Sequence, residues 1–257
     1  MLFAIDMGNS NIVLGCLKDS ELLFEERLST DTSKTELEYA IAFKNIFELH
    51  QINITDITGS IISSVVPQLT EVIHNAVNKI TGLDAMIVGP GIKTGLHIII
   101  DNPAQLGSDL VVAAVAGLKE YAPPLAIIDM GTATKISVIN ESAKYIGCII
   151  IPGLKTALEA LVSNTSQLQG ISLVAPQKVV GRNTIDSMKS GMIYGNAACI
   201  DGLLERIEEE LGQEVTVIAT GGLADKVLPY CKRKIILEQA LLLKGLNEIY
   251  EKNQFFS

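Results

Sequence analysis

The chain lacks the features that mark membrane-spanning and nucleic-acid-binding proteins. Its apolar runs, such as residues 125–128 and 148–151, are the length of a β-strand and far shorter than the ~20 residues of a membrane-spanning helix. Basic residues are in the minority, with 20 Lys and Arg against 29 Asp and Glu and a formal net charge of −9. Because nucleic-acid binding favours a basic face, we expect neither nucleic acid nor membrane as a partner.

Cysteine and histidine are also scarce and scattered. None of the three histidines lies in a metal-ligand pattern, and the four cysteines form no CxxC pair or Cys-His cluster. We interpret the cysteines as buried or free thiols in a reducing compartment. Residues 1–5 run directly into Asp6 without the basic segment of a secretory signal. We therefore expect a cytoplasmic protein.

What the chain does have is apolar content and regular patterning. It contains 257 residues, 48% of them hydrophobic, which is enough for one large domain or two of ordinary size. Strands are predicted at 3–6, 12–17, 22–28, 59–66, 85–88, 126–129, 136–139, 146–151 and 215–219. Helices are predicted at 35–49, 69–81, 110–121, from 152, at 184–212 and at 238–252. A hairpin sheet followed by alternating helices and strands, given twice, predicts two α/β half-domains, residues 1–116 and 117–257.

One short sequence motif occurs at the start of each half. Residues 4–10 read AIDMGNS and residues 127–132 read IIDMGT. In both, a strand delivers a carboxylate that can reach Mg²⁺ or a water on it. The glycine lets the backbone approach a phosphate, and the polar residue that follows can donate to a phosphate oxygen. The duplication predicts two related half-domains that bind one nucleotide triphosphate.

These phrases and four others resemble the type III pantothenate kinases, of the acetate and sugar kinase/actin/heat-shock-chaperone ATPase superfamily. The six segments are residues 6–11, 102–109, 129–134, 152–153, 181–191 and 219–224. They fall in the family's order and cover nearly the whole chain. The resemblance implies duplicated actin-like (ribonuclease H-like) half-domains with ATP in the interdomain cleft. It also implies a homodimer that transfers the ATP γ-phosphate to the hydroxyl of pantothenate, the first step to coenzyme A.

The resemblance assigns the cofactors and the ATP site. Its cofactors are ATP, Mg²⁺ and a monovalent cation, K⁺ or NH₄⁺. Asp6 would hold Mg²⁺ through a water, and Asp129 would hold the monovalent cation. The ATP-binding residues are Asp6, Met7, Gly8, Asn9, Ser10, Asn11, Ile12, Val13, Thr132, Gly221 and Gly222. The alternatives are turn-capping aspartates and, for the glycine pair, an ordinary strand-to-helix turn.

Asp109 is the candidate catalytic residue. Phosphoryl transfer to an alcohol needs a carboxylate that orients the hydroxyl and accepts its proton, and the family's proton acceptor falls on Asp109. The alternative is that Ser108 or Asp109 only caps the helix that follows. The resemblance implies substrate contacts at Ile100, Gly107, Ser108, Asp109, Leu110 and Thr184. Thr184 suits the first turn of a helix equally well.

Four positions depart from the family pattern. The family usually has Tyr at the position of Ile100 and Arg at that of Leu110, both of which contact pantothenate. After the second phosphate loop, the usual Thr and Asp are Lys135 and Ser137. An Arg–anion contact is worth about 1.5–3 kcal/mol, roughly 10–150-fold in binding. Two alternatives are therefore a kinase of a different small alcohol on the same fold and a low-turnover nucleotide-binding regulatory paralogue, although the retained Asp109 argues against the second.

Overall fold

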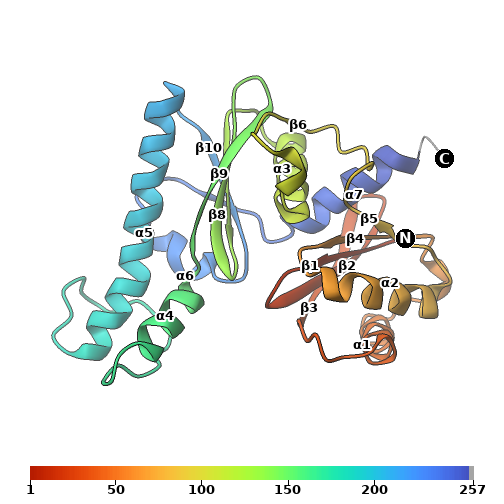
Figure 1. The fold of residues 1–257 in the computed structure, drawn as a ribbon, viewed down its shortest axis with the longest axis horizontal. Helices are drawn as coiled ribbons and strands as arrows, with labels where there is room; N and C mark the ends of the chain where they lie inside the picture. Colours follow the sequence, from red (N-terminus) through yellow and green to blue (C-terminus); the bar gives the residue numbers. More distant parts are fainter. Residues whose placement is uncertain (255–257) are drawn as a thin grey trace. The chain divides into compact units, whose positions relative to one another are not determined.

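The protein consists of two compact units, seen in a computed structural model that describes residues 1–254 (Figure 1). Unit 1 comprises residues 1–96, 101–119 and the chain from Ala240 onward, and unit 2 comprises residues 97–100 and 120–239. This division differs from continuous halves at 1–116 and 117–257 in three places, the first being a boundary at 119/120 rather than 116/117. The C-terminal helix packs on the first sheet, and residues 97–100 join unit 2 because they pair with a strand of the second sheet.

Unit 1 is built on a five-stranded mixed sheet with the order β3-β2-β1-β4-β5. Its strands are β1 (Leu2–Met7), β2 (Asn11–Lys18), β3 (Glu21–Ser29), β4 (Gly59–Ser64) and β5 (Met86–Ile87). The first three form antiparallel hairpins, and β4 and β5 continue the sheet in parallel with β1. All six residues of β1 are buried, as expected of a central strand that is covered on both faces.

Helices cover both faces of this sheet (Figure 1). They are α1 (Glu36–Leu49), α2 (Pro67–Thr81), α3 (Ser108–Glu120) and α7 (Leu241–Gln254), with short 3₁₀ turns η1 (Ile54–Asp56) and η2 (Pro103–Gln105). On the α1 side, Phe3 packs edge-on against Phe43 and Phe47, with ring centroids 5.5 and 4.8 Å away. On the other side α7 contacts β1, β2 and β4. Its Gly245 lies against α3, where an added Cβ would come within 2.2 Å of the Val112 carbonyl oxygen.

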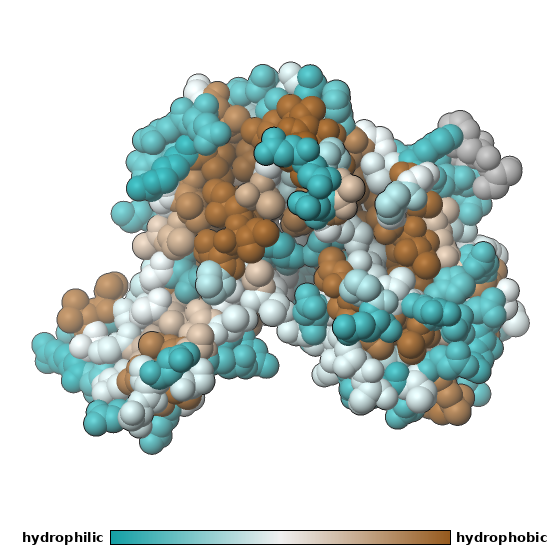
Figure 2. Space-filling model, in the orientation of Figure 1, coloured by the Kyte–Doolittle hydropathy of each residue, from teal (hydrophilic) through white to brown (hydrophobic). Residues whose placement is uncertain are grey.

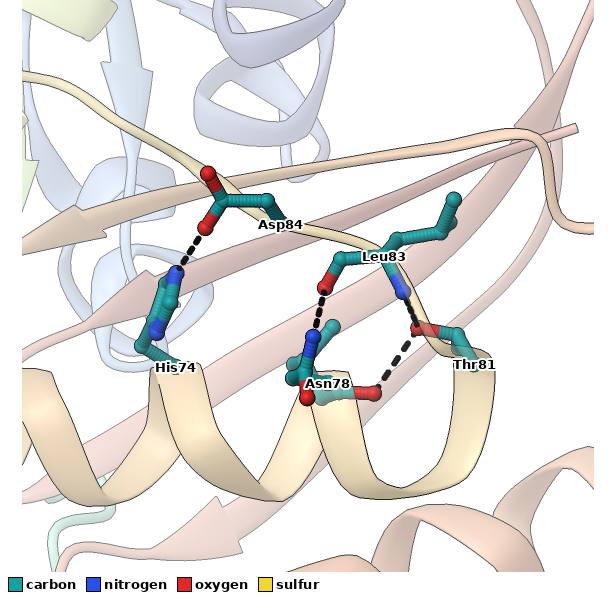
Figure 3. A network of polar contacts seen from close by, with 6 residues as sticks. His74, Asn78, Thr81, Leu83 and Asp84 are labelled. Atoms are coloured by element: carbon teal, nitrogen blue, oxygen red, sulfur yellow. Dashed lines mark hydrogen bonds and ion pairs between the residues drawn. The ribbon is translucent and has the colours of Figure 1, made fainter.

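The end of α2 shows how local sequence sets an element boundary (Figure 3). Gly82 stops the helix with a left-handed φ of 71°, which glycine adopts without penalty. The Asn78 side chain donates to the Leu83 carbonyl at 3.1 Å. His74 lies 2.7 Å from an Asp84 carboxylate oxygen in the segment after the helix, so this histidine has a structural partner.

Unit 2 repeats the sheet and extends it by one strand. The order is β11-β10-β7-β8-β9-β6, with β6 (His97–Ile98), β7 (Leu125–Met130), β8 (Ala133–Ile139), β9 (Lys144–Pro152), β10 (Thr216–Thr220) and β11 (Ile236–Leu237). Its helices are α4 (Leu154–Ser163), α5 (Thr184–Leu211) and α6 (Ala224–Val227), followed by the turn η3 (Leu228–Tyr230). Strands β7 to β11 pair as β1 to β5 do. The predicted α/β fold with a duplicated sheet is confirmed.

Most of the predicted elements lie within a few residues of the observed ones. Two observed strands of two residues each, β6 and β11, were not predicted. The helix predicted over 238–252 begins at Leu241. In the part of the chain that the structure describes, no helix combines the length and the apolar character that crossing a membrane would require.

Candidate active site

The predicted first phosphate loop, residues 6–11, is fixed at the end of β1 by the neighbouring strands. Asp6 is the fifth residue of β1 and is only 6% exposed. In the turn that follows, the Gly8 amide donates to the Asn11 carbonyl at 2.9 Å. Thr30, just after β3, donates its hydroxyl to the Gly8 carbonyl at 2.6 Å and its amide to the Ser10 carbonyl at 3.1 Å. The backbone of the loop is therefore held by three hydrogen bonds, one within the loop and two from Thr30.

This arrangement divides the predicted ATP-binding residues into two groups. The side chains of Met7 and Ile12 are fully buried in the core, so they can serve a nucleotide only through their backbone. Asn9, Ser10 and Asn11 are exposed and present polar groups at the tip of the loop. Val13 lies directly opposite Asp6 in the antiparallel register of β2.

The predicted second phosphate loop, residues 129–132, repeats this construction in unit 2. Asp129 is again the fifth residue of its strand, β7, and the Gly131 amide donates to the Ala133 carbonyl at 3.1 Å. The segment after β9 holds the loop, since Gly153 donates its amide to the Thr132 carbonyl at 3.2 Å and Thr156 donates its hydroxyl to the same oxygen at 2.8 Å. A Cβ on Gly153 would lie 2.3 Å from the Gly131 carbonyl oxygen, so α4 begins in direct contact with the loop.

Gly221 is brought beside this second loop from a distant part of the chain. Its φ is +98°, and an added Cβ would lie 2.6 Å from both the amide nitrogen and the carbonyl oxygen of Met130. Only glycine satisfies both conditions. Gly222 follows it as an exposed residue. The predicted contacts at Asp129, Thr132 and Gly221 therefore lie at one edge of the second sheet.

Asp109 lies in the first turn of α3, and the start of this helix is tied to β4. The Ser108 hydroxyl is 3.0 Å from the Ser63 hydroxyl, accepts from the Ser64 amide at 3.1 Å and donates to the Ser64 carbonyl at 3.0 Å. Ser63 in turn pairs with Asp6 in the parallel register of β4 and β1. Tertiary structure thus brings Asp6 and Asp109, separated by about a hundred residues of sequence, to the same edge of one sheet.

The structure only partly supports the alternative that Ser108 or Asp109 merely caps this helix. The hydrogen bonds given above for the Ser108 hydroxyl are with Ser63 and Ser64 of β4 rather than with the helix. Asp109 accepts from the amide of Leu110 at 2.8 Å through Oδ1, and it is 9% exposed. Gly107 lies close to the same carboxylate, because a Cβ there would come within 2.6 Å of Oδ1.

The remaining predicted acceptor residues lie on both units. Leu110 is buried at 7% exposure next to Asp109 in unit 1. Ile100 is half-buried and Thr184, the first residue of α5, is exposed, and both belong to unit 2. Thr184 does lie in the first turn of α5, which the side chain of Asn183 caps by accepting from the amide of Asp186 at 2.9 Å.

Lys135 is a further charged residue at the second loop. It stands opposite Asp129 in the register of β7 and β8, and its Nζ lies 3.0 Å from Asp129 Oδ2. Both side chains are mostly buried, with 18% and 15% exposure. Within residues 1–254, no group of three or more His, Cys, Asp or Glu side chains is arranged to hold a metal ion.

The duplicated sheet with a carboxylate and a glycine loop at equivalent strand ends defines the class as an α/β protein built on two mixed sheets. A conserved Baf family protein from Campylobacter jejuni matches with a TM-score of 0.59 and 18% identity, over 99% of this chain and 100% of that one. Component A of (R)-2-hydroxyglutaryl-CoA dehydratase from Acidaminococcus fermentans matches with a TM-score of 0.57 and 14% identity, over 97% and 96% of the two chains.

Sequence comparison places the chain more narrowly. The family model described as type III pantothenate kinase matches residues 2–206. A type III pantothenate kinase from Bacillus cytotoxicus is 42% identical over 253 residues, which are 98% of this chain and 97% of that protein. The chain belongs to the type III pantothenate kinase family, and the family predicted from the ordered motifs is confirmed.

Proposed function

We propose that the protein transfers the γ-phosphate of ATP to the hydroxyl of pantothenate, the first step of coenzyme A biosynthesis, with Asp109 as the general base. The observation that carries this assignment is the Ser63–Ser108 contact, which fixes Asp109 at the sheet edge where β1 delivers Asp6. Family membership supplies the reaction class. The geometry of unit 1 supplies the two carboxylates that a metal-dependent transfer to an alcohol needs.

ATP binds to the two glycine loops in this proposal. Asn9, Ser10 and Asn11 of the first loop and Thr132 of the second donate to phosphate oxygens. The buried Met7 and Ile12 contribute backbone contacts only. The backbone at Gly221 and Gly222 lies along the adenosine. Thr30, after β3, holds the first loop, and Thr156, after β9, holds the second. Hydrogen bonds already present before ATP binds reduce the conformational entropy that the loops lose on binding.

Asp6 fits Mg²⁺ by the chemistry of its donor. It is a buried carboxylate beside a polar, exposed loop, and Mg²⁺ prefers oxygen ligands and retains several waters. Asp6 therefore holds the ion through a water in this proposal. When bound, Mg²⁺ neutralises charge that develops on the transferring phosphoryl group.

Asp109 orients the acceptor hydroxyl and takes its proton. Its place in the first turn of a 13-residue helix puts the carboxylate near the positive end of the helix dipole. Gly107 leaves room directly beside Oδ1, since a Cβ at position 107 would lie 2.6 Å from that oxygen unless the carboxylate moved.

The acceptor contacts are Ile100, Gly107, Ser108, Leu110 and Thr184. Leu110 is a buried apolar side chain and offers no donor to the pantothenate carboxylate. The exposed hydroxyl of Thr184 and the backbone amides at the start of α3 take over part of that role. The buried, apolar side chain of Leu110 is the specific observation in favour of the second candidate, a kinase of a different small alcohol.

The protein acts in the cytoplasm as a homodimer in this proposal. Exposed small residues on α5, among them Gly191 and Gly195, leave open space at their Cβ positions. Figure 2 shows apolar residues gathered over β8 and β9, and Ile150 of β9 is 63% exposed. Both features are compatible with burial against a second copy. Light scattering that returned a 27.6 kDa particle at micromolar concentration would remove the dimer.

The test is a coupled assay of ADP release with ATP, Mg²⁺ and pantothenate. Asp109→Asn should lower kcat by ~10²–10⁴-fold while leaving ATP binding intact, as expected for loss of a general base. Asp6→Asn should weaken Mg²⁺-dependent ATP binding, measured by calorimetry. Asp19→Asn, in the exposed β2–β3 turn with a φ of 50°, is the matched control, because asparagine tolerates this conformation. Wild-type turnover by Asp109→Asn would exclude Asp109 as the base.

The assay also separates the alternatives. ADP release with another small alcohol but not with pantothenate would establish the second candidate. ATP binding without turnover on any alcohol would indicate the nucleotide-binding regulator.

A further inference from the structure

At the second phosphate loop, a cationic side chain of the protein itself, that of Lys135, lies beside Asp129. The family resemblance implies an exchangeable monovalent cation at Asp129. In this chain the Lys135 ammonium lies 3.0 Å from Asp129 Oδ2, within ion-pair distance. The two residues face each other across the β7–β8 hairpin, so the strand register itself holds the ammonium at the carboxylate.

The first loop provides an internal comparison. Asp6 and Asp129 occupy the same fifth position of equivalent strands, and each is paired in register with a hydroxyl residue on the parallel neighbour strand. The antiparallel partner differs, since it is the apolar Val13 opposite Asp6 but Lys135 opposite Asp129. The cationic side chain is thus specific to the loop at which the family pattern places a monovalent cation.

The same position also offers a free cation fewer oxygen ligands than the usual family residues would. Ser137 lies two residues along β8 and so points to the same face as Lys135. The family usually has Asp there and Thr at position 135. Ser137 is 1% exposed, and its hydroxyl is 3.2 Å from the Tyr145 hydroxyl. Positions 129, 135 and 137 carry no net charge in this chain, whereas the usual family residues would carry two negative charges.

A K⁺ or NH₄⁺ ion at Asp129 does not fit this set. It would meet an ammonium at contact distance from the carboxylate that should bind it, and like charges in a mostly buried setting repel strongly. It would also find a neutral hydroxyl, already hydrogen-bonded, where a second carboxylate is usual.

We propose that the Lys135 ammonium replaces the exchangeable monovalent cation, so that the second phosphate loop is organised for ATP without K⁺ or NH₄⁺. Lys135 is a positioning residue, because it acts through Asp129 on the loop that carries Thr132. The Lys135 side chain is covalently held 3.0 Å from Asp129 Oδ2, so the site is occupied at any salt composition. This inference rests on the kinase function proposed above.

The first experiment uses the unaltered protein. Turnover with ATP as its Tris salt, Mg²⁺ and pantothenate is compared in KCl, NH₄Cl and tetramethylammonium chloride at equal ionic strength. Its Tm is compared in the same salts with ATP and Mg²⁺ but no acceptor. Turnover should differ by less than about twofold and Tm should not change, because an ion that does not bind the native state cannot stabilise it. A larger activation by K⁺ or NH₄⁺, or a rise in Tm with either ion, overturns the proposal.

The Tm comparison needs no pantothenate, so it decides the cation question even if the acceptor is a different molecule. Failure of the proposed function appears as absent ADP release in every salt, whereas failure of this inference appears as a salt-specific Tm or rate.

The second experiment restores the family residues. Lys135→Thr with Ser137→Asp should make turnover depend on K⁺ by about tenfold or more and make Tm rise with KCl but not with tetramethylammonium chloride. Lys135→Met keeps the apolar stem without the charge and should weaken ATP binding in tetramethylammonium chloride. Lys155→Met, on an α4 side chain that is 75% exposed, is the control and should behave like the native protein. Salt-independent, native-like turnover by both Lys135 variants would show that Lys135 has no such role.

Discussion

Removal of the Ser108 hydroxyl at the start of α3 should destabilise unit 1 and also displace Asp109, and the two effects can be measured separately. The Ser108 hydroxyl makes three contacts with the end of β4, at 3.0, 3.1 and 3.0 Å. Ser63, one of its partners, is fully buried. Ser108→Ala therefore leaves a buried hydroxyl and the Ser64 amide without this partner. Leaving buried polar groups unsatisfied costs about 1–3 kcal/mol.

A cost of ~2 kcal/mol in the free energy of unfolding corresponds to a fall in Tm of roughly 4–8 °C for a chain of this size. The same substitution releases the helix start that carries Asp109. Because a misplacement of about 1 Å can cost ~10²-fold in rate, kcat should fall at a temperature where the variant is still fully folded. The decline should be in kcat rather than in the KM for ATP, since neither glycine loop is altered.

The assays are differential scanning calorimetry and steady-state kinetics well below the Tm. Ser163→Ala, at the exposed end of α4, is the control and should change the free energy of unfolding by less than about 0.5 kcal/mol. An unchanged Tm in Ser108→Ala would refute the stabilising role of the contacts with β4. A lowered Tm with native kcat would refute the dependence of Asp109 on this anchor.

Three further predictions follow from other parts of the molecule. Gly153→Ala, whose Cβ would lie 2.3 Å from a carbonyl oxygen of the second loop, should raise the Kd for ATP and lower Tm, as measured by calorimetry; native values would show that the loop has room to move. Ile100→Tyr with Leu110→Arg should tighten pantothenate binding by roughly 10–150-fold, the value of a restored Arg–anion contact; unchanged binding would indicate a pocket shaped for another molecule. Burial raises the pKa of Cys16 to about 11 and that of Cys231 to about 12. A thiol reagent at pH 8 should therefore modify only the exposed Cys148 and Cys199 in the native protein, but all four cysteines after unfolding. Rapid modification of all four in the native state would contradict this.

The local parts of the fold were predictable because their signals are local. The Asp-Met-Gly phrases, the hairpin strands and the helix that follows Asn183 are each encoded within a few residues. The repetition of the first phrase also predicted the repetition of the sheet, since equivalent strands place Asp6 and Asp129 at equivalent positions. Motif order was sufficient to predict the family, which the comparisons confirmed.

Other features arise only from contacts between distant segments. The packing of α7 on the first sheet does not follow from a helical pattern, because an apolar face does not specify the surface that covers it. Two-residue strands such as β11 exist only because a longer neighbour pairs with them.

The candidate site shows the same division. The sequence by itself predicted the candidate residues for the chemistry, namely two aspartates on strands and one at a helix start. Tertiary structure decided which of them meet, because the parallel pairing of β1 with β4 and the Ser63–Ser108 contact bring Asp109 to the edge that holds Asp6. It likewise decided that the Lys135 ammonium rests on Asp129, since the register of a hairpin, rather than the identity of its residues, sets which side chains face each other.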